Sequence, residues 1–465
     1  MAHRTSPARS ATSTRAATPL LLVVLCTAHF MDSIDLSDVT VALPAVQRDL
    51  GLSAGSLAWI VSAYLLGYGG FLLLGGRCAD VLGRRRVFIT AVAVFGLLSI
   101  VAALAPNVGV LIAARALKGV AAGFLAPAAL SLITSIWTDP QARGRAIGVF
   151  ATAGAAGFVG GLVLGGLVTE LSWRFAFALP VPFAIAVLLL APRLVPRSAD
   201  VVHREPLDVL GAVLVTLGFS AVVVVLTEAP ALGWAHPLVL SLLAVGVLAL
   251  AGFGVREAPR TRVPLLPLSF LARRTTIGTS ISIATIWAAY TGFAFLATLG
   301  MQDTLGWSPL QAGLAFVPLG IVNGVLAPRM GRLAGRYGAG YLVAVGIVLL
   351  TVSYALFFRM GDAAGFVGVF LPIMVVNGLG LACAFAPLNL AAMQAAEANR
   401  QGLAAAVLST AQQLGGAVGL SLVTAVAAAS STTAGGPAAT ATVVVVSALG
   451  VSGAALLVRR RHATT

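Results

Sequence analysis

Apolar runs of about 20 residues alternate with short polar gaps along almost the whole chain. Each run is long enough to cross the ~30 Å hydrocarbon core of a bilayer. The pattern predicts fourteen membrane-spanning helices, with no gap long enough for a soluble domain. The expected helices lie at about 19–44, 54–75, 87–106, 110–135, 142–169, 174–192, 207–227, 237–255, 275–300, 309–328, 339–358, 364–392, 401–428 and 438–458.

Composition supports an all-α polytopic membrane protein. The 465 residues are 59% hydrophobic and 9% charged, whereas soluble domains carry about 25% charged residues. The formal net charge of +14 is compatible with nucleic acid as a partner. The basic residues, however, are arginines in the short gaps, with Lys118 as the one lysine. That distribution indicates a positive-inside topology rather than a nucleic-acid-binding face, so we expect no nucleic-acid partner.

The arginines also predict the orientation of the chain. Of the 29 basic residues, 24 lie in gaps that would all be on one side of the membrane. The other side holds only Arg48, Arg174 and Arg359, while Arg115 and Lys118 lie within a helix. Since cytoplasmic loops carry the excess of basic residues, we expect both termini in the cytoplasm and a multi-pass protein of the bacterial cytoplasmic membrane.

A faint internal repeat suggests two related halves. The stretches "GRCADVLG" at 76–83 and "GRLAGRYG" at 331–338 share Gly, Arg, Ala and Gly at matching places. Parallel repeats of six helices are a transporter architecture. We therefore expect two six-helix bundles with an inserted two-helix hairpin. The expected units are an N-terminal tail at 1–18, a first bundle at 19–192, the hairpin with its flanking loops at 193–272, a second bundle at 273–458 and a tail at 459–465.

Several motifs resemble those of the major facilitator superfamily. "LIAARALKG" at 111–119 is similar to its fourth-helix motif, with Arg115 as the arginine, and "SIDLSDVTVALP" at 33–44 to its first-helix motif, with Asp35 as the aspartate. Thr40 replaces the usual asparagine. "GRCADVLGRRR" at 76–86 resembles the superfamily's loop motif. The matching loop positions are Gly76, Asp80, Gly83, Arg84 and Arg85. The resemblance implies that Asp80 helps to latch the two halves in one conformation.

The fifth expected helix carries the glycine spacing of antiporters in this superfamily. The matching positions are Gly148, Gly157, Gly161, Gly165 and Gly166, while Leu162 replaces the family proline. Glycines three or four apart let membrane helices approach closely, so rocking and ordinary tight packing are both compatible with the row. Leu162 restores a backbone donor and should reduce bending. The chain thus resembles the fourteen-helix drug:proton antiporters, which implies proton-coupled export of small lipophilic drugs by alternating access.

The first expected helix contains three aspartates, which are costly in a membrane. Asp32, Asp35 and Asp38 recur every three residues, so each step turns about 60° around the helix and all three cannot face one point. A carboxylate at this depth faces a cavity, pairs with a cation or takes up a proton. We expect Asp35 to be the proton-coupling residue and Arg115 to be its partner, with Asp32 as a second proton site or an anchor for cationic substrates.

The remaining polar and aromatic candidates have competing interpretations. Asp38 lies nearer the outer face, where we expect it to be hydrated, and we expect His29 to be a packed polar residue rather than a relay. Aromatic side chains at helical spacing either line a substrate cavity or pack against lipid and protein. The candidates for a cavity are Asp32, Trp59, Tyr64, Trp287, Tyr290, Phe293, Phe295, Asn377 and Gln412.

The sequence favours a transporter over an enzyme. It contains no Walker sequence, no HExxH and no Cys/His cluster, and Cys26, Cys78 and Cys383 have no metal-site spacing. We expect no cofactor and no metal. The expected partners are a small-molecule substrate, protons and the lipid bilayer, and we expect a monomer. An uptake symporter on the same fold is the near alternative, and a membrane-embedded enzyme or a sensor is a more distant one.

Overall fold

The computed structural model describes residues 11–196, 209–256, 268–359, 365–395, 401–429 and 437–457, which are helical and contain no strand. The expected tail at 459–465, most of the tail at 1–18 and parts of the loops that flank the hairpin lie outside these residues. The first half comprises α1 (Ala11–Leu50), α2 (Ala54–Leu82), α3 (Arg84–Ala103), α4 (Val108–Ile136), α5 (Pro140–Thr169), α6 (Trp173–Ala178) and α7 (Pro180–Leu194). The hairpin comprises α8 (Val209–Leu232) and α9 (Pro237–Arg256). The second half comprises α10 (Leu268–Leu271), α11 (Arg274–Leu299), η2 (Gly300–Thr304), α12 (Pro309–Ala315), α13 (Val317–Tyr337), α14 (Ala339–Leu356), η3 (Phe357–Arg359), η4 (Phe366–Phe370), α15 (Leu371–Ala395), α16 (Gln401–Ala429) and α17 (Pro437–Leu457).

The predicted fold class is confirmed. Among the described residues, thirteen helices are long and apolar enough to span a membrane, and α8 with its apolar stretch Val213–Leu226 corresponds to the fourteenth. Some crossings are interrupted near a proline that starts the next segment, as at Pro180 between α6 and α7, because proline lacks the amide that would continue the helix. In contrast, α1 runs through Pro44 to Leu50, so Arg48 lies in its last turn rather than in a loop.

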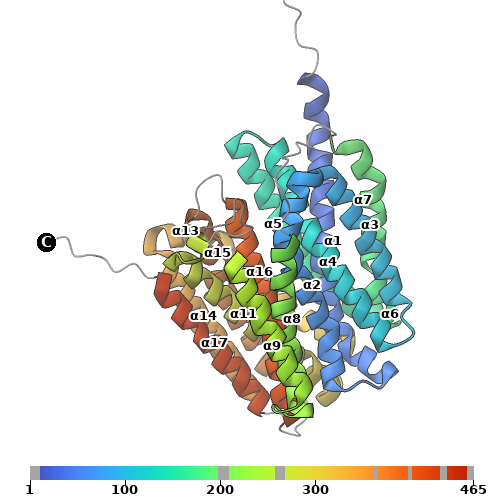
Figure 1. Cartoon of the computed structure of the whole chain (residues 1–465), viewed down its shortest axis with the longest axis vertical. Helices are drawn as coiled ribbons and strands as arrows, with labels where there is room; N and C mark the ends of the chain where they lie inside the picture. Colours follow the sequence, from blue (N-terminus) through green and yellow to red (C-terminus); the bar gives the residue numbers. More distant parts are fainter. Residues whose placement is uncertain are drawn as a thin grey trace, which may run out of the picture.

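The hairpin lies at the seam between the two halves (Figure 1). α8 packs against α2 of the first half and against α16 of the second, and α2 and α16 also contact each other. The Trp59 indole on α2 donates a hydrogen bond of 3.3 Å to the Glu228 carboxylate on α8. The hairpin is thus part of the interface between the bundles.

The glycine row of α5 brings its backbone against α1. A Cβ atom added at Gly161 would lie 2.6 Å from the Ile34 carbonyl oxygen, and one at Gly165 would lie 2.7 Å from the Asp38 Cα. A Cβ at Gly157 would likewise meet the backbone of Phe30 at 2.5 Å. These glycines are required for the close approach of two membrane helices.

The other two glycines of the motif lie elsewhere. Gly166 faces the second half, where an added Cβ would lie 2.7 Å from the Pro309 carbonyl oxygen. Gly148 has nothing within 4 Å, so it is not part of either interface. α5 is continuous from Pro140 to Thr169.

The packing of α1 on α5 predicts a difference between two substitutions in one helix. Gly161→Ala should destabilise the protein by about 1–3 kcal/mol, because the new methyl group overlaps the α1 backbone. Gly148→Ala should be neutral or slightly stabilising, since alanine favours helix and meets no neighbour. Thermal unfolding of the purified proteins measures the difference. Equal melting temperatures would contradict the close approach.

Candidate functional site

Three charged side chains form a fully buried cluster between α1 and α4. Asp35 lies on α1, while Arg115 and Lys118 lie three residues apart on α4, and all three have side-chain exposures of 0%. Arg115 donates from Nη1 to Asp35 Oδ2 at 2.6 Å, and Lys118 donates from Nζ to Asp35 Oδ1. One carboxylate therefore pairs with two cations. The predicted pairing of Asp35 with Arg115 is confirmed.

The two cations are held by further contacts in the first half. Arg115 donates from Nε to the Ile60 carbonyl oxygen at 3.0 Å, and its guanidinium carbon lies 4.3 Å from the centre of the Tyr64 ring. The Lys118 ammonium lies 4.7 Å from the centre of the Phe95 ring. Both aromatic contacts stabilise a desolvated cation. Sequence reasoning did not predict that Lys118 pairs with Asp35. The signal was available, because Lys118 is the one lysine of the sequence and follows Arg115 by three residues in the same membrane helix.

Asp32 lies one turn earlier on α1 and interacts with α2. Its carboxylate accepts hydrogen bonds from the Tyr64 hydroxyl at 2.5 Å and from the Tyr68 hydroxyl at 3.2 Å. Tyr64 is thus a partner of Asp32 and not part of a cavity wall, which corrects the expectation for it. The His29 ring stacks on Phe150 at 4.2 Å, with Nδ1 3.9 Å from an Asp32 oxygen. His29 is a packed residue, as expected.

Asp38 differs from both of the other aspartates. Its exposure is 0%, and neither carboxylate oxygen accepts a hydrogen bond from any described residue. The expectation of a hydrated carboxylate near the outer face is therefore wrong. The physical reason is the packing of α5, because Gly165 has no side chain and its backbone covers Asp38.

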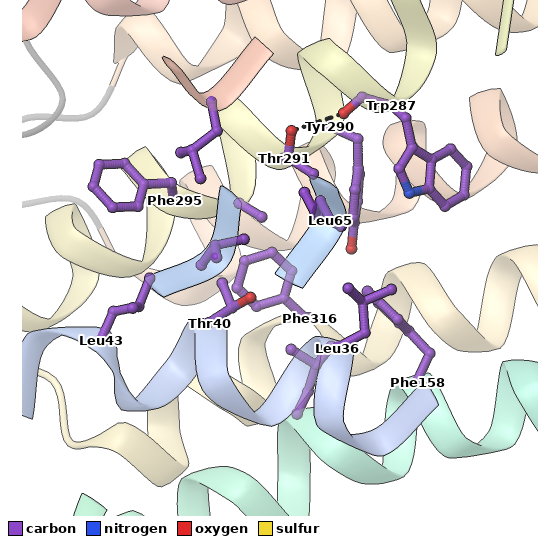
Figure 2. A pocket seen from close by; sticks show the side chains of 14 residues that line it. Leu36, Thr40, Leu43, Leu65, Phe158, Trp287, Tyr290, Thr291, Phe295 and Phe316 are labelled. Carbon is purple, nitrogen blue, oxygen red and sulfur yellow. Dashed lines mark hydrogen bonds between the residues drawn. The ribbon is translucent and has the colours of Figure 1, made fainter. Parts of the chain in front are cut away.

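A small cavity lies between the two halves (Figure 2). Its volume is about 30 Å³, far below the 300–1,000 Å³ typical of sites for small ligands. The cavity is thus too small, in this conformation, to hold a drug-sized molecule. The lining residues are Leu36, Thr40 and Leu43 of α1, Val61 and Leu65 of α2, Phe158 and Leu162 of α5, Trp287, Tyr290, Thr291, Ala294 and Phe295 of α11, Phe316 between α12 and α13, and Leu420 of α16.

The walls of this cavity are mostly apolar and aromatic. Figure 2 shows Trp287, Tyr290 and Thr291 on one side, with Leu36 and Phe158 across from them. Trp287 and Tyr290 have ring centres 5.8 Å apart, and Phe158 lies 6.0 Å from Tyr290 across the two halves. The polar side-chain groups of the lining are the hydroxyl groups of Thr40, Tyr290 and Thr291 and the indole N–H of Trp287. Such walls suit a lipophilic molecule with few polar groups.

The structure brings three of the predicted cavity residues together: Trp287, Tyr290 and Phe295. Phe293 instead packs inside the second half, 5.0 Å from the Tyr354 ring, and Asn377 donates to the Ser353 hydroxyl at 3.0 Å. Trp59 binds the hairpin. Asp32 and the half-buried Gln412 do not line the cavity either. Sequence reasoning missed Thr40 and Thr291 as lining residues.

The two halves meet through direct contacts at the end of the molecule opposite the N-terminus. The Ser308 hydroxyl at the start of α12 donates to the Glu170 carboxylate at the end of α5, at 2.7 Å. The buried Gln302 amide donates to the Val41 carbonyl oxygen on α1, at 2.9 Å. Together with the packing of Gly166 on α12, these contacts close this end of the molecule.

The loop motif is folded within the first half. Arg84 donates from Nη2 to Asp80 at 3.0 Å, and Arg85 donates to the Pro192 carbonyl oxygen of α7 at 2.8 Å. Gly83 has a φ of +101°, which favours glycine where α2 turns into α3. Gly76 faces Pro127 on α4. Among the described residues, the side-chain hydrogen bonds of Asp80 come from Arg84. The latch role of Asp80 stays a prediction.

The charge balance of the buried cluster predicts the result of removing its anion. Asp35→Asn should destabilise the protein by about 3–5 kcal/mol, because it leaves buried cations without their counter-ion. Adding Lys118→Met removes one uncompensated charge and should restore a large part of that loss. Thermal unfolding of both variants tests the pair. A double variant less stable than Asp35→Asn alone would contradict the cluster.

The model of the Major Facilitator Superfamily matches this chain over residues 25–420 and 275–464. The chain is 38% identical to the puromycin resistance protein pur8 of Streptomyces alboniger, over 87% of this chain and 81% of that protein. It is 36% identical to the cephamycin export protein CmcT of Amycolatopsis lactamdurans, over 87% and 84% of the two chains. It is 31% identical to the lincomycin resistance protein of Streptomyces lincolnensis, over 87% and 83%.

A solved structure shares the fold. The crystal structure of the peptide transporter POT in complex with sulfate superposes with a TM-score of 0.69, at 17% identity, over 94% of this chain and 93% of that one. At this identity the similarity shows the fold alone.

Proposed function

We propose that this chain exports small lipophilic molecules such as antibiotics, and the premise is its family: the chain belongs to the major facilitator superfamily. The observation that carries the proposal is the similarity, over most of both chains, to relatives named for puromycin resistance, cephamycin export and lincomycin resistance. The mostly apolar, aromatic cavity between the halves supports it. An uptake symporter shares this fold, but the names of these relatives favour export.

We further propose that export is coupled to protons by the α1 cluster, with Asp35, Asp32 and Arg115 as the coupling residues. A carboxylate in a membrane protein is stable when it is paired or protonated. Asp35 is fully buried and paired with cations on another helix. A relative movement of α1 and α4 would weaken that pairing and favour proton uptake, since a nearby cation stabilises the ionised form and burial the neutral one.

The transport cycle would proceed by alternating access. The contacts of Glu170 with Ser308 and of Gln302 with Val41 close the end of the molecule opposite the N-terminus. Opening that end requires α5 to separate from α12, and the packed glycines of α5 would then move with α1 as a unit. The loop motif around Asp80 and Arg84 would brace α2 and α3 during this movement.

We place the protein as a monomer in the cytoplasmic membrane, with both termini in the cytoplasm. The arginines of the loops support this orientation through the positive-inside rule. In that orientation the contacts between Glu170 and Ser308 lie on the outer side.

The proposal predicts uphill transport by purified protein in proteoliposomes. An imposed pH gradient should drive accumulation of at least one of puromycin, a cephamycin or lincomycin, and dissipating the gradient should abolish it. Asp35→Asn/Lys118→Met, which lacks the titratable group but keeps the charge balance, should permit downhill exchange without accumulation. Accumulation at the wild-type rate by this variant would exclude Asp35 as the coupling residue. Failure of folded wild-type protein with all three compounds would remove the antibiotic proposal.

A further inference from the structure

The buried charges of the first half do not balance if every group is ionised. Asp32, Asp35 and Asp38 of α1 would contribute three negative charges, while Arg115 and Lys118 of α4 contribute two positive ones. All five residues are buried: each aspartate is at most 4% exposed and the two cations are 0% exposed. An uncompensated charge in such surroundings costs several kcal/mol. One proton on one carboxyl makes the group neutral.

The contacts of the three carboxyls indicate where that proton lies. Asp35 accepts hydrogen bonds from both cations, which strongly favours its ionised form. Asp32 accepts hydrogen bonds from two tyrosine hydroxyl groups, which also stabilise a negative charge. Asp38 receives no hydrogen bond from a described residue. Desolvation without a partner favours the neutral carboxylic acid.

We propose that Asp38 binds a proton in this conformation, and is therefore a proton-binding site in addition to Asp35. The charged groups that act on it are Asp35 on its own helix and Arg115 and Lys118 on α4. On its other side α5 brings the Gly165 backbone, and that helix has no charged residue from Ala146 to Thr169. No cation on this part of α5 therefore competes with the proton for Asp38.

The cluster also holds a donor that Asp38 could use in another conformation. Arg115 Nη2 is buried and donates to no described residue. If Asp35 took up a proton, the guanidinium would lose its charged acceptor. Asp38, a buried carboxyl without a hydrogen-bond donor, could then accept from it. The proton and the cation would then exchange places between two carboxyls one turn apart. As a step of transport, this exchange rests on the proposed function.

Infrared spectra of the purified protein in lipid vesicles, recorded over a pH titration, test the site directly. Wild-type protein should show the absorption of a protonated carboxyl at neutral pH that disappears at high pH. Asp38→Glu should shift the frequency of this band while keeping the number of charges. Asp32→Glu and Asp35→Glu, the matched controls on the same helix, should leave its frequency unchanged. Asp38→Asn, which preserves volume, should abolish the band, and its folding is verified by thermal unfolding.

The outcomes separate this inference from the transport proposal, because the spectra require no substrate. Absence of a protonated carboxyl from wild-type protein at neutral pH would overturn the Asp38 site, and so would a band that shifts with Asp32→Glu or Asp35→Glu. A chain that shows the Asp38 band but exports no antibiotic would retain the proton site and lose the export proposal. Uphill export by a protein without the band would retain the export proposal and overturn the Asp38 site.

Discussion

The need to neutralise charges that are shielded from water governs the arrangement of the first half. Asp35 must face α4, because Arg115 and Lys118 have no exposure to solvent and require an anion. That geometry depends on how closely α2 and α4 pack. A Cβ atom added at Gly67 would lie 2.9 Å from the Val120 amide nitrogen, so the two backbones are in contact. This approach places the Arg115 guanidinium over Tyr64 and within reach of the Ile60 carbonyl oxygen.

The sequence was sufficient for the fold and for part of the site. Apolar runs of this length predict membrane helices, because backbone N–H and C=O groups in lipid must bond within the protein and a helix satisfies them within one segment. The pairing of Asp35 with Arg115 followed from motifs with recognisable spacing. The burial of Asp38 did not, since it depends on a glycine of α5, distant in sequence, that packs on the same turn of α1. Likewise, Tyr290 and Phe293 lie on one helix that is buried nearly all round, so its composition does not reveal which face meets the other half.

The hairpin restricts how the halves can move. α8 packs on both α2 and α16, and an added Cβ at Gly70 of α2 would lie 2.6 Å from the Thr216 hydroxyl of α8. A helix in such close contact cannot follow one bundle without sliding against the other. The small side chains at this seam make sliding compatible with tight packing, since lipid provides no hydrophobic force that would hold the helices together.

α1 contributes both to the cavity and to the buried acidic cluster, so it could link the proposed proton and substrate sites without contact between them. Leu36, Thr40 and Leu43 recur at spacings of four and three, so they share one face of the helix, and that face lines the cavity. Asp35 and Asp38 point away from that face, toward α4 and α5, whereas Asp32 lies at its edge and contacts α2. A carboxyl that changes its protonation state alters the attraction between α1 and α4, and any resulting displacement of α1 moves the cavity wall as well. If export is coupled to protons as proposed, the coupling would be mechanical and would pass through α1, so that the acidic cluster need not contact the substrate.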